Sequence, residues 1–292
     1  MAGMKAKTIC KILDAKIKDL ASSAEHDHIK EILATKTVVT GGCIASMLTG
    51  DPINDYDIYF RDISSVRSIA NYYVAKFEAT TGHKLSVSEE GDRVRIMVAQ
   101  GYRGETAGDI QTLGTDEIDD AYEGAEAAAL AVENDGKPQY RPVFLSTNAI
   151  TLSNKAQLVL RFYGEPDTIH ENYDFVHCTN YWSSWDRKLV LRPAALESLL
   201  SRELRYVGSK YPICSIIRLR KFIKRGWTIN AGQILKMIMQ INELDLHDPK
   251  VLEDQLTGVD TAFFMEVLNK LHEKDPDKIN AAYLVEIIDR MF

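Results

Sequence analysis

The stretch Thr37-Val-Val-Thr-Gly-Gly-Cys-Ile-Ala-Ser-Met-Leu-Thr-Gly-Asp-Pro-Ile-Asn-Asp-Tyr-Asp-Ile-Tyr-Phe60 decides the fold of this chain. It begins with a β-branched run, which is typical of a strand, and this run ends at Gly41 and Gly42. A short segment of small and apolar residues follows, and a second strand-like run carries Asp55 and Asp57. The order predicts a strand, a helix and a second strand.

The two acids and the two glycines suit neighbouring metal and phosphate sites. In a strand, residues two apart share a face, so Asp55 and Asp57 should present both carboxylates to one side. Mg²⁺ is usually held by one or two carboxylates together with substrate phosphates. Gly41 and Gly42 allow the backbone to approach a phosphate closely, and a helix starting at about Cys43 would point its amides at the same anion.

These residues resemble the nucleotidyltransferase superfamily, which includes polymerase beta-like enzymes, poly(A) polymerases and tRNA CCA-adding enzymes. The shared signature is Gly-Gly, a short spacer and Asp-x-Asp between apolar residues; here residues 43–54 form the spacer. The resemblance implies that Asp55 and Asp57 bind catalytic Mg²⁺ or Mn²⁺, and that Gly41, Gly42 and Ser46 hold the triphosphate of an NTP.

This sequence departs from that pattern at two places. Thr40 stands where an apolar residue precedes the glycines, and Ala45-Ser46 replaces the Arg-Asp of CCA-adding enzymes, which weakens that particular assignment. The pattern also resembles bacteriophage-encoded nucleotidyltransferases without an assigned substrate.

The resemblance further implies a third carboxylate on a strand beside the Asp-x-Asp strand, acting as metal ligand and as base for the attacking hydroxyl. We expect this residue to be Asp174, because it lies in an apolar and aromatic run. Asp186, which precedes a second apolar run, is the alternative.

Composition describes an ordinary globular chain of 292 residues, enough for one large or two modest domains. No apolar run is long enough to span a bilayer, and the first residues lack a signal-peptide core, so we expect a cytoplasmic protein without a membrane partner. The four cysteines show no Cys-x-x-Cys spacing, which predicts neither a zinc site nor a disulfide framework.

The net charge of −7 is unevenly distributed, and residues 201–236 carry a basic excess. Such a patch is expected when the partner is rich in phosphate, which favours an RNA acceptor. Lys210, Arg218 and Lys221 are the candidates for nucleotide contact. The basic residues of this segment, set against the single acid Glu203, are Arg202, Arg205, Lys210, Arg218, Arg220, Lys221, Lys224, Arg225 and Lys236.

The same segment predicts a helix over 215–224, with Ile216, Leu219 and Ile223 on its buried face. Aromatic residues are interleaved with its charges, and they suit either a protein core or stacking on nucleobases. They are Tyr206, Tyr211, Phe222 and Trp227.

Periodicity predicts an α+β chain with three parts. Residues 1–36 form N-terminal helices (8–21 and 28–35) that pack on the core. Residues 37–192 form the nucleotidyltransferase domain, with an acidic, mobile insertion at about 103–138. Residues 193–292 form a helical domain, with helices at 194–207, 215–224, 231–242, 248–255, 260–272 and 278–292.

Within the central part the pattern predicts strands at 94–99, 143–152 and 157–163. It also predicts a helix that is capped by Ser64 or Ser65 and runs to about Phe77, with these residues on its inner side: Val66, Ile69, Tyr73 and Phe77. The resulting hypothesis is a metal-dependent enzyme that transfers NMP from an NTP to a hydroxyl, with an RNA 3′ end, tRNA-like ends included, as the favoured acceptor. Two alternatives stay open: a catalytically silent binding or structural protein with this fold, and an enzyme that nucleotidylates a protein, as toxin-type relatives do, or a small molecule.

Overall fold

A computed structural model describes residues 3–82, 84–98, 139–146 and 148–246, together with residues 248, 251 and 255. The chain divides into two compact units, and each is treated by itself. The described part of the first unit lies within residues 3–98, 139–171 and 177–200. The second unit contains residues 172–176 and the described residues from 201 onward.

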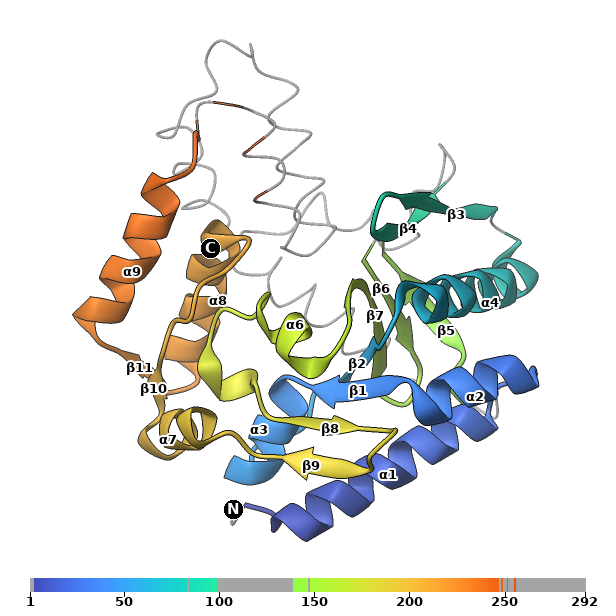
Figure 1. The fold of residues 1–292 in the computed structure, drawn as a ribbon, viewed down its shortest axis with the longest axis horizontal. Helices are drawn as coiled ribbons and strands as arrows, with labels where there is room; N and C mark the ends of the chain where they lie inside the picture. Colours follow the sequence, from blue (N-terminus) through green and yellow to red (C-terminus); the bar gives the residue numbers. More distant parts are fainter. Residues whose placement is uncertain are drawn as a thin grey trace, which may run out of the picture. The chain divides into compact units, whose positions relative to one another are not determined.

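The first unit is built around a mixed sheet with the strand order β5-β6-β7-β2-β1-β8-β9 (Figure 1). β2 and β7 run parallel, and the other neighbouring pairs are antiparallel. This mixed sheet with its helices confirms the predicted α+β class. The strands are β1 (Thr37–Thr40), β2 (Tyr56–Phe60), β5 (Pro142–Leu145), β6 (Ala149–Leu152), β7 (Ala156–Tyr163), β8 (Tyr181–Ser183) and β9 (Lys188–Val190).

The helices of this unit include the two predicted at the N-terminus and the one predicted after the glycine pair. The helix that follows residue 192 in the sequence also belongs here, except for its last residue. The helices are α1 (Ala6–Ser22), α2 (Asp27–Thr35), α3 (Gly42–Thr49), α4 (Ile63–Thr81), α6 (Pro166–His170) and α7 (Pro193–Ser201).

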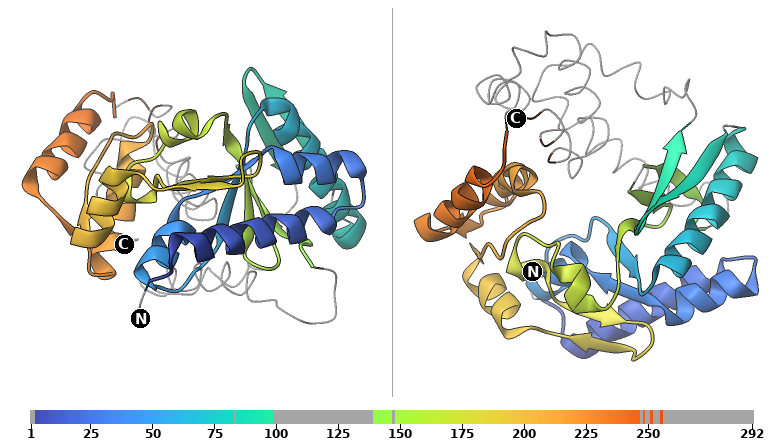
Figure 2. Two further views of the ribbon diagram at one scale, coloured as in Figure 1. Left: turned by 60° about the horizontal axis from the view of Figure 1, so that its bottom comes forward. Right: turned by 45° about the horizontal axis from the view of Figure 1, so that its top comes forward.

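The sheet has an apolar face and a polar face, because side chains alternate along each strand. One row of paired residues across five strands is apolar and buried: Ile150, Leu158, Ile58, Val39 and Trp182. The neighbouring row, here called the polar row, points to the other face: Thr151, Gln157, Asp57, Thr40 and Tyr181. Figure 2 shows α1 along one side of the sheet and α6 on the other.

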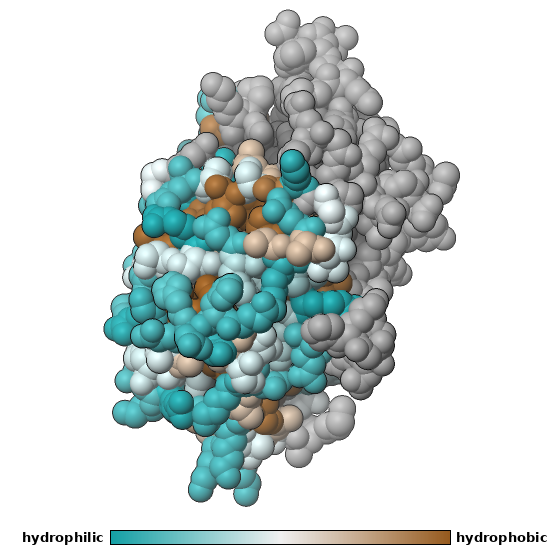
Figure 3. All heavy atoms as spheres, turned by 90° about the vertical axis from the view of Figure 1, so that its right-hand side faces the viewer, coloured by the Kyte–Doolittle hydropathy of each residue, from teal (hydrophilic) through white to brown (hydrophobic). Residues whose placement is uncertain are grey.

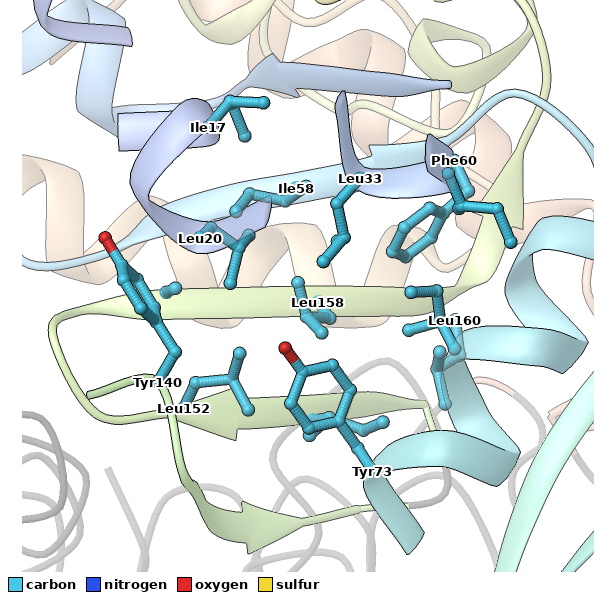
Figure 4. Close-up of a cluster of buried hydrophobic side chains, with 14 of the residues drawn as sticks. Ile17, Leu20, Leu33, Ile58, Phe60, Tyr73, Tyr140, Leu152, Leu158 and Leu160 are labelled. Carbon is cyan, nitrogen blue, oxygen red and sulfur yellow. The ribbon is translucent and has the colours of Figure 1, made fainter. Parts of the chain in front are cut away.

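The apolar face forms the core of the unit with the inner sides of α1, α2 and α4 (Figure 4). On α1, Leu13, Ile17 and Leu20 recur at helical spacing and are all buried. Burying each such side chain stabilises the fold by about 1.5–3 kcal/mol. The side of the unit that carries α2 and α4 is mainly hydrophilic, with smaller hydrophobic areas (Figure 3). The amphipathic helices therefore pack on the apolar face of the sheet, and the polar row lies on the opposite face.

Asp62 determines where α4 begins. Its carboxylate accepts hydrogen bonds from the Ser65 amide at 2.8 Å and from the Ser64 hydroxyl at 2.5 Å. The expected cap, Ser64 or Ser65, is therefore wrong, because both serines lie within the first turn of the helix. The predicted inner positions are confirmed as buried: Val66, Ile69, Tyr73 and Phe77.

Two predicted strands differ from the structure. The stretch 143–152 is a hairpin of β5 and β6, closed by a hydrogen bond from the Ser146 amide to the Ala149 carbonyl at 2.9 Å. The strand predicted at 94–99 is β4 (Arg93–Val98), and it pairs with β3 (Leu85–Glu90), which the sequence pattern did not reveal. The strand predicted at 157–163 is confirmed as β7.

The second unit contains a short parallel pair, β10 (Glu203–Leu204) and β11 (Thr228–Ile229), with α8 (Pro212–Lys224) between them in sequence and α9 (Ala231–Asn242) after them. The helix predicted to run to 207 ends at Ser201, since Arg202 has a φ of 50°. α9 confirms the prediction for 231–242. The acidic insertion and the last three predicted helices lie outside the described residues, apart from positions 248, 251 and 255.

Candidate nucleotide and metal site

The glycine pair forms the turn between β1 and α3. Gly41 has φ 88° and ψ −151°, a combination essentially restricted to glycine. Its N–H donates to the Cys178 carbonyl at 3.1 Å, so Gly41 shapes the turn, and its amide is already engaged. Gly42 opens α3, is exposed, and has no atom within 4 Å of where a Cβ would stand. Gly41, the residue that precedes α3, has no side chain that could cap the helix, and a helix start of this kind suits an anion.

The paired carboxylates lie directly beside this turn. The register places Thr40, the last residue of β1, opposite Asp57 in β2, and Asp55 immediately precedes β2. Both acids are partly exposed. Burial raises the pKa of the Cys43 thiol well above its usual value, and the charges of Asp57 and Asp55 raise it further. Both carboxylates therefore lie near the first turn of α3, as their spacing predicted.

This arrangement fits a magnesium ion that also binds a ligand. Asp55 and Asp57 offer hard oxygen donors, which Mg²⁺ prefers. Across the described parts of the chain, no three His, Cys, Asp or Glu side chains form a cluster that could hold a metal. A cation here would therefore need further oxygens from phosphate or water, which is the usual coordination of Mg²⁺ in phosphate-binding sites.

Thr40, the residue before the glycine turn, connects the turn to His170 of α6 through its side-chain hydroxyl. Its buried hydroxyl lies 2.8 Å from His170 Nε2 and 2.8 Å from the Asn180 carbonyl oxygen. Because a carbonyl only accepts, the hydroxyl donates to Asn180 and accepts from His170 Nε2–H. Burial, and then the positive charge of Arg192, lower the pKa of His170 to about 4, so its ring is neutral at physiological pH. No sequence motif pointed to His170.

Asp174 does not occupy the position that the sequence predicted. The strands beside β2 are β1 and β7, and neither contains an acid. Asp174 precedes a single bridge between Phe175 and Tyr206 in the second unit, and its Oδ2 accepts a hydrogen bond from Arg218 Nε at 2.6 Å. The predicted strand placement is therefore wrong, while a metal-binding role for Asp174 stays a prediction.

The alternative third acid, Asp186, is placed still less favourably. It is exposed in the turn between β8 and β9. That turn lies at the opposite end of β1 from the glycines, since the Ser184 amide donates to the Thr37 carbonyl at 2.9 Å. At about 3.3 Å per residue, the length of β1 separates Asp186 from the glycine turn by roughly 10 Å or more. The structure excludes Asp186 from this site.

The three predicted basic contacts belong to the second unit. Lys210 is exposed, and Arg218 and Lys221 are partly exposed on α8. The predicted buried face of α8 is wrong, because Ile216 and Ile223 are exposed. The residues that this helix buries are Pro212, Ile213, Cys214, Ser215 and Ile217. Phosphate binding by the basic residues stays a prediction.

The interleaved aromatic residues form a small core instead of a stacking surface. Tyr206, Tyr211 and Trp227 are buried, and the Phe222 ring meets both Phe175 and Trp227 edge to face. A nucleobase has no access to faces that are already packed. Base stacking by the buried members of this set is therefore excluded.

Fold and site together define an α+β protein in which a helix begins at a glycine turn beside two acidic side chains. The chain belongs to the Gabija anti-defense 2 family (Gad2), whose pattern matches residues 11–202, more than half of its length. A protein called Gabija anti-defense 2, from Bacillus phage SPbetaL7, is 23% identical over 119 residues. This similarity covers 39% of the chain and 30% of that phage protein, so the chain spans less than a third of this curated relative.

Solved structures of tRNA-processing enzymes are similar only at a coarse level. A tRNA-processing enzyme with CTP gives a TM-score of 0.39 at 10% identity, covering 94% of this chain and 57% of its own. The Thermotoga maritima CCA-adding enzyme complexed with tRNA gives 0.39 at 12% identity, covering 88% and 53%. Scores of this size carry no argument about activity. None of the helices in the described ranges combines the length and apolar character needed to cross a membrane.

Proposed function

We propose that this protein is a metal-dependent nucleotidyltransferase that moves a nucleoside monophosphate from an NTP to a hydroxyl acceptor. The observation that carries the proposal is the pairing of Thr40 with Asp57, which sets an uncapped helix start beside two carboxylates. Nucleotide phosphates and divalent cations usually bind as a complex. Here the first amides of α3 suit the phosphates, and the two carboxylates suit the cation.

Each residue of the site has a specific role in the proposal. The first amides of α3, beginning at Gly42, hold the triphosphate, and Ser46 lies one turn further along the same helix. Asp55 and Asp57 bind Mg²⁺ or Mn²⁺. The cation neutralises charge on the phosphates and orients them, which is most of what catalysis of phosphoryl transfer requires. Gly41 and Thr40 keep the turn in shape. Because the Gly41 amide already donates to the Cys178 carbonyl, the phosphate contact predicted for Gly41 passes to Gly42 in this proposal.

In the reaction, the acceptor oxygen attacks the α-phosphorus of the NTP. A new phosphorus–oxygen bond forms, the bond to the β-phosphate oxygen breaks, and pyrophosphate leaves with its electron pair. The hydroxyl proton passes to a base or to water.

The acceptor is favoured to be RNA, because residues 201–236 are basic and the segment's basic side chains are at least partly exposed. The family's name describes an anti-defense protein, and modification of a hydroxyl needed by a defence system is one way in which such a protein could act. We expect Asp174 to act on the acceptor hydroxyl. Asp174 is paired with Arg218 in the second unit, so variants of both residues are needed to test this role.

The test is incubation of the purified full chain with each α-³²P-labelled NTP, Mg²⁺ or Mn²⁺ and total cellular RNA. We expect label on RNA with the wild-type chain and with Asp186→Asn, which changes an acid outside the site. The double variant Asp55→Asn/Asp57→Asn should give none. Label on protein would change the acceptor class, whereas no label with any nucleotide would favour a silent binding protein.

A further inference from the structure

Gln157 is the residue that the sheet places next to Asp57 on the side away from Thr40. β7 is the parallel neighbour of β2, and the register pairs Gln157 with Asp57. Side chains of paired residues project to the same face of a sheet. Gln157 therefore stands on the polar face, with Asp57 between it and Thr40. Both Gln157 and Asp57 are partly exposed.

The strands beside β2 bring no further acid to this face. On the polar side β1 contributes Val38 and Thr40, while β7 contributes Gln157, Val159 and Arg161. Among the strands β1, β2 and β7, the negative charge on this face therefore comes from Asp57 in the middle of the polar row, with Asp55 immediately before β2.

The charge balance of this set limits how many cations it can hold. Two divalent ions about 3.5–4 Å apart, as in two-metal sites, place four positive charges in a small volume. Asp55 and Asp57 offset two of them and the nucleotide phosphates offset others, but the Gln157 amide offsets none because it is neutral. The phosphates of a nucleotide complete the coordination of one ion, but a second ion beside Gln157 would find no acidic ligand on β1 or β7, the two strands beside β2.

We propose that Gln157 restricts this site to a single divalent cation, held by Asp55, Asp57 and the nucleotide phosphates. The inference rests on the proposed function and deepens it. The acceptor hydroxyl is then oriented by side chains of the protein. No second ion lies beside Gln157 to lower the pKa of that hydroxyl.

The test is an electron paramagnetic resonance titration of the full chain with Mn²⁺ and a non-hydrolysable NTP analogue. It counts bound ions and detects pairs, because two Mn²⁺ ions that share ligands couple magnetically. Gln157→Glu has the shape of the wild-type side chain and adds only a charge, and Gln157→Asn retains the amide as a control. We expect one uncoupled ion for the wild type and Gln157→Asn, and a coupled pair for Gln157→Glu.

The other outcomes distinguish failure of the single-ion inference from failure of the proposed function. A coupled pair in the wild type would overturn the single-ion inference and leave the proposed function standing. A single ion in Gln157→Glu, with its fold verified by circular dichroism, would also overturn the role of Gln157. Absence of any protein-bound Mn²⁺ in the wild type would instead contradict the proposed function itself.

Discussion

Thr40 pairs with Asp57 across β1 and β2, and this single register brings the glycine turn and the two carboxylates together. The turn follows Thr40 directly, and Asp55 and Asp57 flank the first residue of β2. A shift by one residue would turn the carboxylate of Asp57 into the apolar core. The buried row of Val39 and Ile58 prevents that shift, so core packing fixes the site.

Gly41 and Gly42 should respond differently to the same added methyl group. Gly41→Ala must adopt a conformation nearly reserved for glycine and should lower the free energy of unfolding by about 1–3 kcal/mol. Gly42→Ala meets no atom within 4 Å and should leave stability within about 0.5 kcal/mol of wild type. Urea denaturation measures both. Calorimetric titration with NTP should show weakened binding for Gly42→Ala, and unchanged binding would exclude a phosphate at the start of α3.

His170 predicts a specific dependence of stability on pH. Its pKa is about 4 in the folded chain, below the value near 6.5 of an unfolded histidine. The unfolded state therefore binds more protons between these values, and stability is lost as the pH falls from about 6.5 to about 4. The full loss is on the order of 3 kcal/mol. Unfolding measured at pH 7.5 and 5.0 should show a smaller difference in His170→Gln than in wild type. Equal differences would contradict the assigned pKa.

Asp62→Ala should destabilise α4 by about 1 kcal/mol through loss of its cap. Although burial acts in the opposite sense, hydrogen bonds from Ser64, Ser65 and Lys36 hold the pKa of Asp62 far below its usual value. The contribution of its charge is therefore present above about pH 4 and is lost at lower pH. Asp62→Asn retains a capping oxygen without the charge and should cost less at pH 7. Thermal unfolding of both variants measures the difference, and an equal cost would show that the cap contributes little.

The Asp174–Arg218 pair should be measurable by a double-mutant cycle. Asp174 is largely buried and Arg218 is partly exposed, so we expect a coupling energy of about 1 kcal/mol from Asp174→Asn, Arg218→Met and the double variant. The same variants, assayed for transfer, separate stability from a role toward the acceptor. A loss of transfer in Asp174→Asn without a loss of stability would support the predicted catalytic role.

Local signals in the sequence predicted that the glycine turn and the two acids lie close together, whereas contacts between distant parts of the chain could not be predicted. The strand, glycine turn, helix and Asp-x-Asp lie within one stretch of the chain, so their order and shared face followed from spacing. Gln157 pairs with Asp57 in the sheet, and His170 is hydrogen-bonded to Thr40. In both cases the two residues are more than 95 positions apart in the sequence. Such neighbours leave no mark in a single sequence.

The choice of Asp174 shows the same limit in the other direction. Its neighbours Tyr173 and Phe175 form an apolar run that reads as a strand. In the structure Phe175 makes only an isolated bridge with Tyr206 and packs into the aromatic cluster of the second unit. An apolar run shows that a segment is buried but does not show which strand it joins.

Binding of an NTP in the presence and absence of Mn²⁺ tests the central claim most directly. Calorimetric titration of the wild-type chain, Asp57→Asn and Asp186→Asn with a non-hydrolysable NTP analogue compares an acid in the site with one outside it. The account predicts Mn²⁺-dependent binding for the wild type and Asp186→Asn, and a loss of at least about tenfold in affinity, or about 1.4 kcal/mol, for Asp57→Asn. Binding that is indifferent to Mn²⁺, or equal in Asp57→Asn and wild type, would contradict it.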